Sequence, residues 1–67
     1  MNWSRLLRDL REEAGISQRS LATRAGMPQR TIAEYENVGS MRQLSIYKVE
    51  LILDSLGYEI EVMLKDV

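Results

Sequence analysis

The chain contains no cysteine and no histidine among its 67 residues. It therefore has no disulfide framework, no zinc site of the usual ligand set, and no thiol or imidazole for catalysis. Long hydrophobic runs are also lacking, since no apolar run exceeds three residues, as in Leu51-Ile52-Leu53, whereas a membrane span needs about 20. The first residues do not show the apolar segment of a signal peptide. We therefore expect a soluble, cytoplasmic protein.

Net charge is also small, because nine lysine and arginine residues face ten aspartate and glutamate residues. A nucleic-acid-binding protein usually has a basic balance, so the total by itself argues against one. The charges are unevenly distributed, however. Residues 1–42 carry seven arginines and five carboxylates, a net charge of +2, whereas residues 43–67 carry two lysines and five carboxylates, a net charge of −3. Arginine suits bidentate contacts with phosphate and guanine, so the first section is the candidate for such contacts.

The spacing of apolar residues predicts three helices in this first section. Apolar residues recur at three- and four-residue steps over residues 2–14, and Gly15 follows as a helix stop. A shorter helix is predicted over residues 17–24, opened by a serine that can serve as its N-cap. A third helix is predicted over residues 28–36, where the initial proline lacks an N–H that would be unpaired at that position anyway.

A fourth helix is predicted in the acidic section, with two possible starts. Ser40 with Gln43 fits a capping box, whereas Ser45 would begin the helix a few residues later. We favour Ser45, because the helix up to Gly57 then has a continuous apolar stripe, made of Ile46, Val49, Ile52, Leu53 and Leu56.

After Gly57 the period of the pattern changes from about 3.6 to 2, which is typical of a β-strand. The apolar face comprises Tyr58, Ile60, Val62 and Leu64, and the other face comprises Glu59, Glu61, Met63 and Lys65. No other segment alternates in this way. A lone strand leaves its backbone donors and acceptors unpaired, so we expect it to pair with the same strand of a second copy.

The charges on this strand favour one antiparallel register. Pairing centred on Ile60 or on Glu61 sets glutamates opposite glutamates, which is destabilising. Pairing centred on Val62 sets Glu59 opposite Lys65, and it also sets Ile60 opposite Leu64 and Glu61 opposite Met63. We predict the Val62-centred register. The apolar side chains of the strands would then lie on the helices of the two subunits, where Trp3 or Tyr47 could meet them.

Residues 17–37 satisfy the spacing of a helix-turn-helix. Ala22 is small where the third helix crosses, and Gly26 permits a positive φ in the turn. The apolar wedge between the helices is predicted to consist of Leu21, Ile32 and Tyr35. A generic helical bundle with a fortuitous turn is the alternative, and it requires these features to coincide at fixed offsets.

The chain resembles the DNA-binding domain of the Xre/Cro-CI repressor family over residues 3–57. The matching segments are Leu-Arg-Glu-Glu-Ala-Gly-Ile-Ser-Gln, Leu-Ala, Ala-Gly-Met, Thr-Ile and Glu-Tyr-Glu-Asn. The sequence departs from the family at Pro28, Gly39 and Leu44. The tail after Gly57 resembles HipB-type antitoxins, in which a short C-terminal strand pairs across a dimer.

This resemblance implies a mainly α fold. Residues 1–57 would form a four-helix, lambda-repressor-like helix-turn-helix DNA-binding domain, and residues 58–67 would form a C-terminal β-strand that pairs across a homodimer. It also implies a structural ion pair between Arg11 of the first helix and Glu36 at the end of the third.

Two sets of residues are predicted to contact double-stranded DNA. If the third helix enters a major groove, its outward positions meet base edges, and these are Pro28, Gln29, Arg30, Ala33 and Glu34. Glutamine can pair with adenine, arginine with guanine, and glutamate with the cytosine amino group. The resemblance assigns Gln18 to backbone phosphate, and further phosphate contacts are expected from Arg19, Thr31, Asn37 and Arg42.

These features predict a sequence-specific transcriptional repressor that binds an inverted repeat as a homodimer. The HipB resemblance extends this to an autoregulating antitoxin of a HipA-like, kinase-like toxin. The alternatives are an interaction module that neutralises a toxin, with DNA binding secondary, and a stand-alone Cro-like phage regulator. No nucleophile elbow, phosphate loop or metal constellation is present in the sequence, so we expect no enzyme activity, metal or cofactor.

Overall fold

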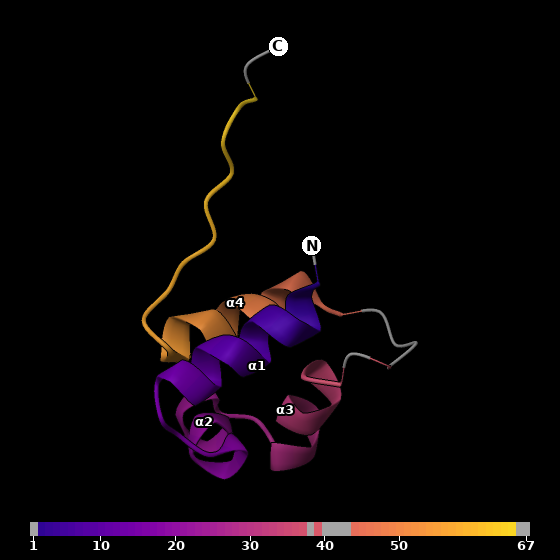
Figure 1. Cartoon of the computed structure of the whole chain (residues 1–67), viewed down its shortest axis with the longest axis vertical. Coiled ribbons are helices and arrows are strands. Elements are labelled where there is room, and N and C mark those ends of the chain that lie inside the picture. Colours follow the sequence, from indigo (N-terminus) through magenta and orange to yellow (C-terminus); the bar gives the residue numbers. More distant parts are fainter. Residues whose placement is uncertain (1, 38, 40–43, 66–67) are drawn as a thin grey trace.

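The computed structural model describes residues 2–37, 39 and 44–65. This part of the chain contains four helices, which are α1 (Trp3–Glu13), α2 (Gln18–Ala25), α3 (Gln29–Tyr35) and α4 (Ile46–Ser55). Helix α2 contacts both α3 and α4, and α1 contacts α3. Figure 1 shows α2 and α3 at the end of the molecule opposite the C-terminal tail. None of the helices in the described residues is long and apolar enough to cross a membrane.

The first two helices begin where the sequence predicts. The side-chain oxygen of Asn2 accepts a hydrogen bond from the backbone N–H of Arg5 at 3.1 Å, and Ser17 Oγ accepts one from the N–H of Ser20 at 3.0 Å. Each bond satisfies a backbone donor that the first turn of a helix would otherwise leave unpaired. Helix α2 ends at Gly26, whose φ of +69° lies in the left-handed region that glycine adopts without strain.

Helix α4 starts as predicted and α3 starts one residue later than predicted, and neither has a side-chain cap. Pro28 is the N-cap of α3, one position before the first helical residue. Ser45 is the N-cap of α4, as favoured from the apolar stripe, although its hydroxyl makes no capping bond. Its backbone N–H instead donates to the Tyr35 hydroxyl at 3.1 Å, which joins the end of α3 to the start of α4. The alternative capping box at Ser40 and Gln43 lies outside the described residues.

A single core joins the four helices. Its buried hydrophobic residues are Leu7, Leu21, Ala22, Ile32, Tyr35, Val49, Ile52 and Leu53. The predicted wedge of the helix-turn-helix is therefore buried, as is the small residue at the crossing of α2 and α3. The prediction that Ile46 belongs to the apolar stripe is wrong, because this side chain is 57% exposed. It occupies the first position of α4, a full turn before the first core residue of that helix.

The tail over residues 58–65 forms neither a helix nor a strand within this single chain. Ile60 packs half-buried against the core, whereas Val62 is 96% exposed and Leu64 is 99% exposed. In Figure 1 the tail extends away from the helices. A strand is defined by its ladder of backbone hydrogen bonds, and no other extended segment among the described residues offers one. The predicted strand and its register stay predictions, and the start of the tail lies against helices of its own chain, where the Tyr58 N–H donates to the Leu53 carbonyl oxygen at 2.9 Å.

Candidate nucleic-acid interface

Helix α3 has one buried and one outward face. Ile32 and Tyr35 are directed into the core, and the adjoining Glu36 is buried as well. Because a helix turns once every 3.6 residues, the positions between these residues fall on the opposite side. Of the five predicted base-contacting residues, Arg30, Ala33 and Glu34 lie on that side, whereas Pro28 and Gln29 lie one turn before Ile32, at the start of the helix. Pro28, Gln29 and Arg30 are exposed, and Ala33 and Glu34 are half-buried. The core thus fixes which face of α3 a ligand can meet.

The chemistry of this outward face suits base edges. Gln29 and Arg30 lie in the first turn of α3, the part of a recognition helix that reaches deepest into a major groove. The carboxamide of Gln29 can donate to and accept from adenine at once, and the guanidinium of Arg30 can donate twice to guanine. The half-buried Ala33 presents a methyl group that can touch the methyl group of thymine.

The predicted phosphate contacts lie around this face. Arg19 is exposed in the first turn of α2, and Thr31 is half-buried in α3. Asn37 is exposed just beyond α3, and its Oδ1 accepts a hydrogen bond from the backbone N–H of Gly39 at 3.0 Å. That bond directs the amide oxygen toward the Gly39 backbone, so the amide nitrogen can donate to phosphate. Arg42, also predicted to contact phosphate, lies outside the described residues.

Arg11 and Glu36 lie in contact beneath the interface. Arg11 Nε lies 2.7 Å from Glu36 Oε2, and Arg11 Nη2 donates to Glu36 Oε1 at 3.1 Å. The Glu36 side chain is only 3% exposed and that of Arg11 is 14% exposed. Arg11 Nη1 also donates to the carbonyl oxygen of Ile16 at 2.8 Å. The pair therefore joins the end of α1, the segment before α2 and the end of α3.

This pairing also affects the acid–base behaviour of Arg11. Its pKa is raised above the ordinary value, first by the side-chain hydrogen bond to Glu36, and further by electrostatic attraction to Glu36 and Glu12. Partial burial acts in the opposite direction and is outweighed. An arginine side chain is charged at ordinary pH in any case, so the pairing strengthens a charge that is already present, and Glu36 has a counter-ion throughout the folded state.

Gln18 is the third member of this cluster. Its Nε2 donates to Glu36 Oε1 at 3.2 Å, so the residue predicted to contact phosphate also has a structural partner. A carboxylate only accepts hydrogen bonds, so it selects the nitrogen side of the amide. The Nε2 group carries two hydrogens, and only one is used by Glu36. The other can donate to a phosphate oxygen, with the orientation of the amide already set.

Sequence patterns did not reveal two of these connections. The bond from Gln18 to Glu36 spans 18 positions, and the bond from Ser45 to Tyr35 spans ten. Both separations far exceed the three or four residues over which a helix brings side chains together, so both contacts depend on tertiary packing. The only signal in the sequence is that Gln18 and Glu36 are polar residues at the ends of two predicted helices. Many pairs of residues share this property, so it does not identify a contact.

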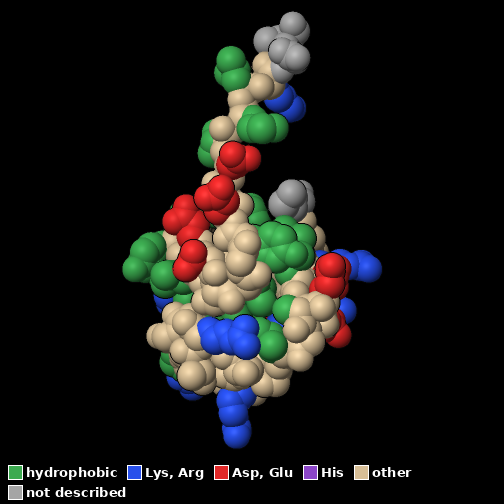
Figure 2. Space-filling view, turned by 90° about the vertical axis from the view of Figure 1, so that its left-hand side faces the viewer, with side chains coloured by type: hydrophobic (Ala, Val, Ile, Leu, Met, Phe, Trp, Pro, Cys, Tyr) green, Lys and Arg blue, Asp and Glu red, His purple; other side chains and the backbone are tan. Residues whose placement is uncertain are grey.

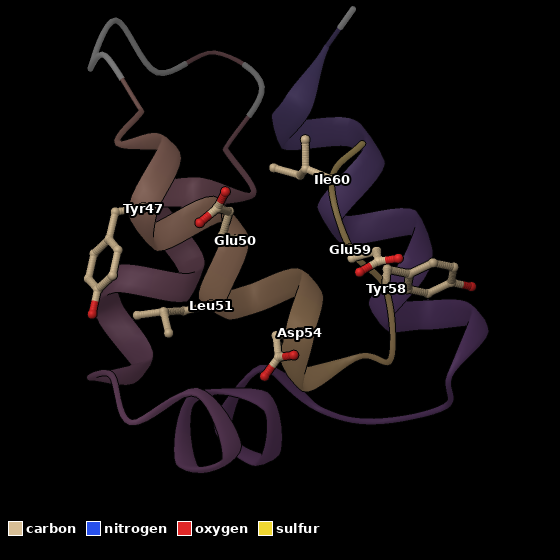
Figure 3. Close-up of a pocket in the computed structure, with 7 residues that line it drawn as sticks. All are labelled: Tyr47, Glu50, Leu51, Asp54, Tyr58, Glu59 and Ile60. Carbon is tan, nitrogen blue, oxygen red and sulfur yellow. The ribbon is translucent and has the colours of Figure 1, made fainter. Parts of the chain in front are cut away.

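The acidic residues lie on a different part of the surface. A hollow of about 380 Å³ is formed by α4 and the start of the tail. As Figure 3 shows, Glu50 and Asp54 enter it from α4 and Glu59 from the tail. Figure 2 shows acidic side chains gathered where the tail leaves the body, whereas lysine or arginine side chains occupy the opposite end. Phosphate would be repelled from the acidic hollow, so the outward face of α3 is the candidate surface for DNA.

A comparison with protein families agrees with this geometry. The model of the family described as helix-turn-helix matches residues 7–63, which include all four helices apart from the first turn of α1. Searches of curated proteins and of solved structures found no match. The family match covers well over half of the chain and includes the α2–turn–α3 unit that carries the outward face. The chain belongs to this helix-turn-helix family, whose members include repressors of the Xre/Cro-CI type. Membership identifies it as a DNA-binding transcription regulator.

Proposed function

We propose that the protein is a sequence-specific transcriptional repressor that binds an inverted-repeat operator as a homodimer. The observation that carries this proposal is the outward face of α3, where Gln29 and Arg30 are exposed in the first turn while Ile32 and Tyr35 anchor the helix in the core. A rigid helix that presents base-reading side chains needs no chemistry of its own. Repression would be steric, because the bound protein occupies the DNA.

A dimer is supported by the tail. Val62 and Leu64 are almost completely exposed in the single chain, which is costly for apolar side chains in water. Residues 58–65 also provide a row of backbone donors and acceptors that a second copy could pair. A two-fold dimer would present two α3 helices to two half-sites about 34 Å apart, one turn of the double helix.

Selection from a random DNA library with the purified full-length protein tests the proposal. An inverted repeat with half-sites one turn apart is the expected result, and binding should weaken steeply with salt as counterions are released from phosphate. Enrichment of a single half-site would mean that the protein reads DNA as a monomer. Absence of any enriched sequence would remove the repressor function.

An antitoxin role is a second candidate, favoured by the acidic hollow. Glu50, Asp54 and Glu59 lie beside the exposed aromatic ring of Tyr47 on a surface that DNA would avoid. A kinase-like toxin with a basic, partly apolar patch would complement this surface. The candidate predicts a toxin gene next to or overlapping the gene for this chain, and its product should co-purify with the protein. Substitution of Glu50 and Asp54 by lysine should abolish that co-purification without affecting operator binding.

A further inference from the structure

A second hollow, of about 330 Å³, lies between α1, α4 and the start of the tail. Its apolar and aromatic lining comprises Trp3, Leu6, Leu10, Leu53, Tyr58 and Ile60. The carboxylates Glu59 and Glu61 also line it. In the monomer this apolar surface lies open next to a tail whose outer half contacts nothing in its own chain, since Val62 and Leu64 are almost fully exposed. We call this hollow the α1 socket.

We infer that the α1 socket receives Leu64 of a second copy of this chain, so that the dimer contact extends from the tail onto α1. The inference rests on the proposed homodimer and specifies where its apolar contact lies. Its first support is geometric. In an antiparallel pairing centred on Val62, Leu64 of the second copy lies directly opposite Ile60, with Cβ atoms about 4.5–5.5 Å apart. Ile60 already lines the socket, so the incoming leucine arrives at its opening.

The direction of the side chains gives a second support. Along an extended chain, alternate side chains point to opposite sides. Ile60, Val62 and Leu64 therefore share one side, and Ile60 directs this side toward α1. Met63 lies on the other side and points away from the socket. Only one of the two large apolar residues near the end of the described tail can therefore fill it.

Charge complementarity gives a third support. The same register sets Lys65 of the second copy opposite Glu59. Both side chains lie on the side of the paired tails opposite Ile60, so this ion pair favours the register that brings Leu64 to Ile60, and the leucine alone enters the socket. By two-fold symmetry the contact occurs twice in each dimer, so losing it has a doubled effect on association.

The test compares full-length Leu64→Ala and Met63→Ala variants by sedimentation equilibrium. Leu64 is 99% exposed in the monomer, so its loss leaves the fold intact. Leu64→Ala should raise the dimer dissociation constant at least tenfold, and Met63→Ala less than threefold. The chain has one tryptophan, so Trp3 emission reports on the socket directly. It should shift to shorter wavelength as the wild-type protein associates.

A second pair of variants locates the leucine in the socket. If Leu64 enters it, the effect of Leu64→Ala on dimerisation should shrink at least threefold in a Leu6→Ala background, because each substitution removes the same contact. Equal effects of Leu64→Ala and Met63→Ala, or additive effects of Leu6→Ala and Leu64→Ala, would overturn the socket while leaving a dimeric repressor intact.

The remaining outcomes separate the socket from the dimer itself. A wild-type protein that stays monomeric at all concentrations would overturn the homodimer and the socket together. Trp3 emission that is independent of concentration but altered by Leu64→Ala would mean that the chain's own tail fills the socket. That result would overturn the assignment to a second copy.

Discussion

Replacing Glu36 by alanine should destabilise the protein more than any other single change at a charged residue described here. Glu36 accepts hydrogen bonds from Arg11 at 2.7 and 3.1 Å and from Gln18 at 3.2 Å, and its side chain is 3% exposed. Alanine would leave the Arg11 guanidinium, 14% exposed, with its hydrogen bond to the Ile16 carbonyl and the attraction of Glu12, but without its buried counter-ion. Removing one member of a buried pair costs about 3–5 kcal/mol, since the other charge is left uncompensated.

That loss is large relative to the stability of so small a chain. At about 0.05–0.15 kcal/mol per residue, a domain of this length is stable by about 3–10 kcal/mol. Urea denaturation followed by circular dichroism measures the change, and with a slope of about 1 kcal/mol per molar the midpoint should fall by about 3 M or more. Glu36→Gln keeps one acceptor oxygen and should lose less, about 1–3 kcal/mol, so it provides a value if the alanine variant does not fold.

A control and a double substitution show whether the reasoning holds. Asp9 pairs with Arg5 at 3.9 Å on the exposed face of α1, so Asp9→Ala should change stability by less than about 0.5 kcal/mol. Replacing Arg11 by methionine together with Glu36 by leucine removes both charges and should recover much of the loss. A Glu36→Ala variant as stable as Asp9→Ala would refute the assignment of a buried, structurally important pair.

Three further changes test the interface, the turn and the tail. Arg30→Ala should lower operator affinity by about 1–3 kcal/mol, roughly ten- to a hundredfold, in fluorescence anisotropy at fixed salt, whereas Arg8→Ala on α1 should leave it unchanged. Gly26→Ala should lower the free energy of unfolding by about 1–2 kcal/mol, because alanine is strained at the positive φ of this position. The strain is the whole cost, since the added Cβ would meet no atom within 4 Å. Val62→Glu should give a monomer in sedimentation with an unchanged monomer fold, because Val62 is 96% exposed and would face its own copy in the predicted register.

Local patterns were sufficient to predict the helices. The cap at Ser17, the glycine at 26 and the three- and four-residue spacing of the core depend on neighbours within a turn or two, so they can be read from the chain directly. Ile46 was assigned wrongly for the same reason. Its spacing fits the apolar stripe of α4, but Ile46 is the first residue of the helix and is exposed, because that end of the helix extends beyond the core.

The candidate site was only partly accessible to such reasoning. The outward face of α3 follows from the helical period once Ile32 and Tyr35 are placed in the core. The contact from Gln18 to Glu36 could not be predicted, because it depends on how the ends of two helices approach each other in space. The strand could not be assessed in one chain, since its expected hydrogen-bond partners belong to another molecule.

The bond between Tyr35 and Ser45 has a consequence for how this protein can change through evolution. Because the Tyr35 hydroxyl accepts a hydrogen bond from the backbone N–H of Ser45, the end of α3 and the beginning of α4 are joined directly by a tertiary bond. Lengthening a connection whose ends are already held adds little entropy cost, about 0.6 kcal/mol for each doubling of its length. The connecting segment can therefore gain or lose residues at little cost in stability while α3 and α4 keep their places.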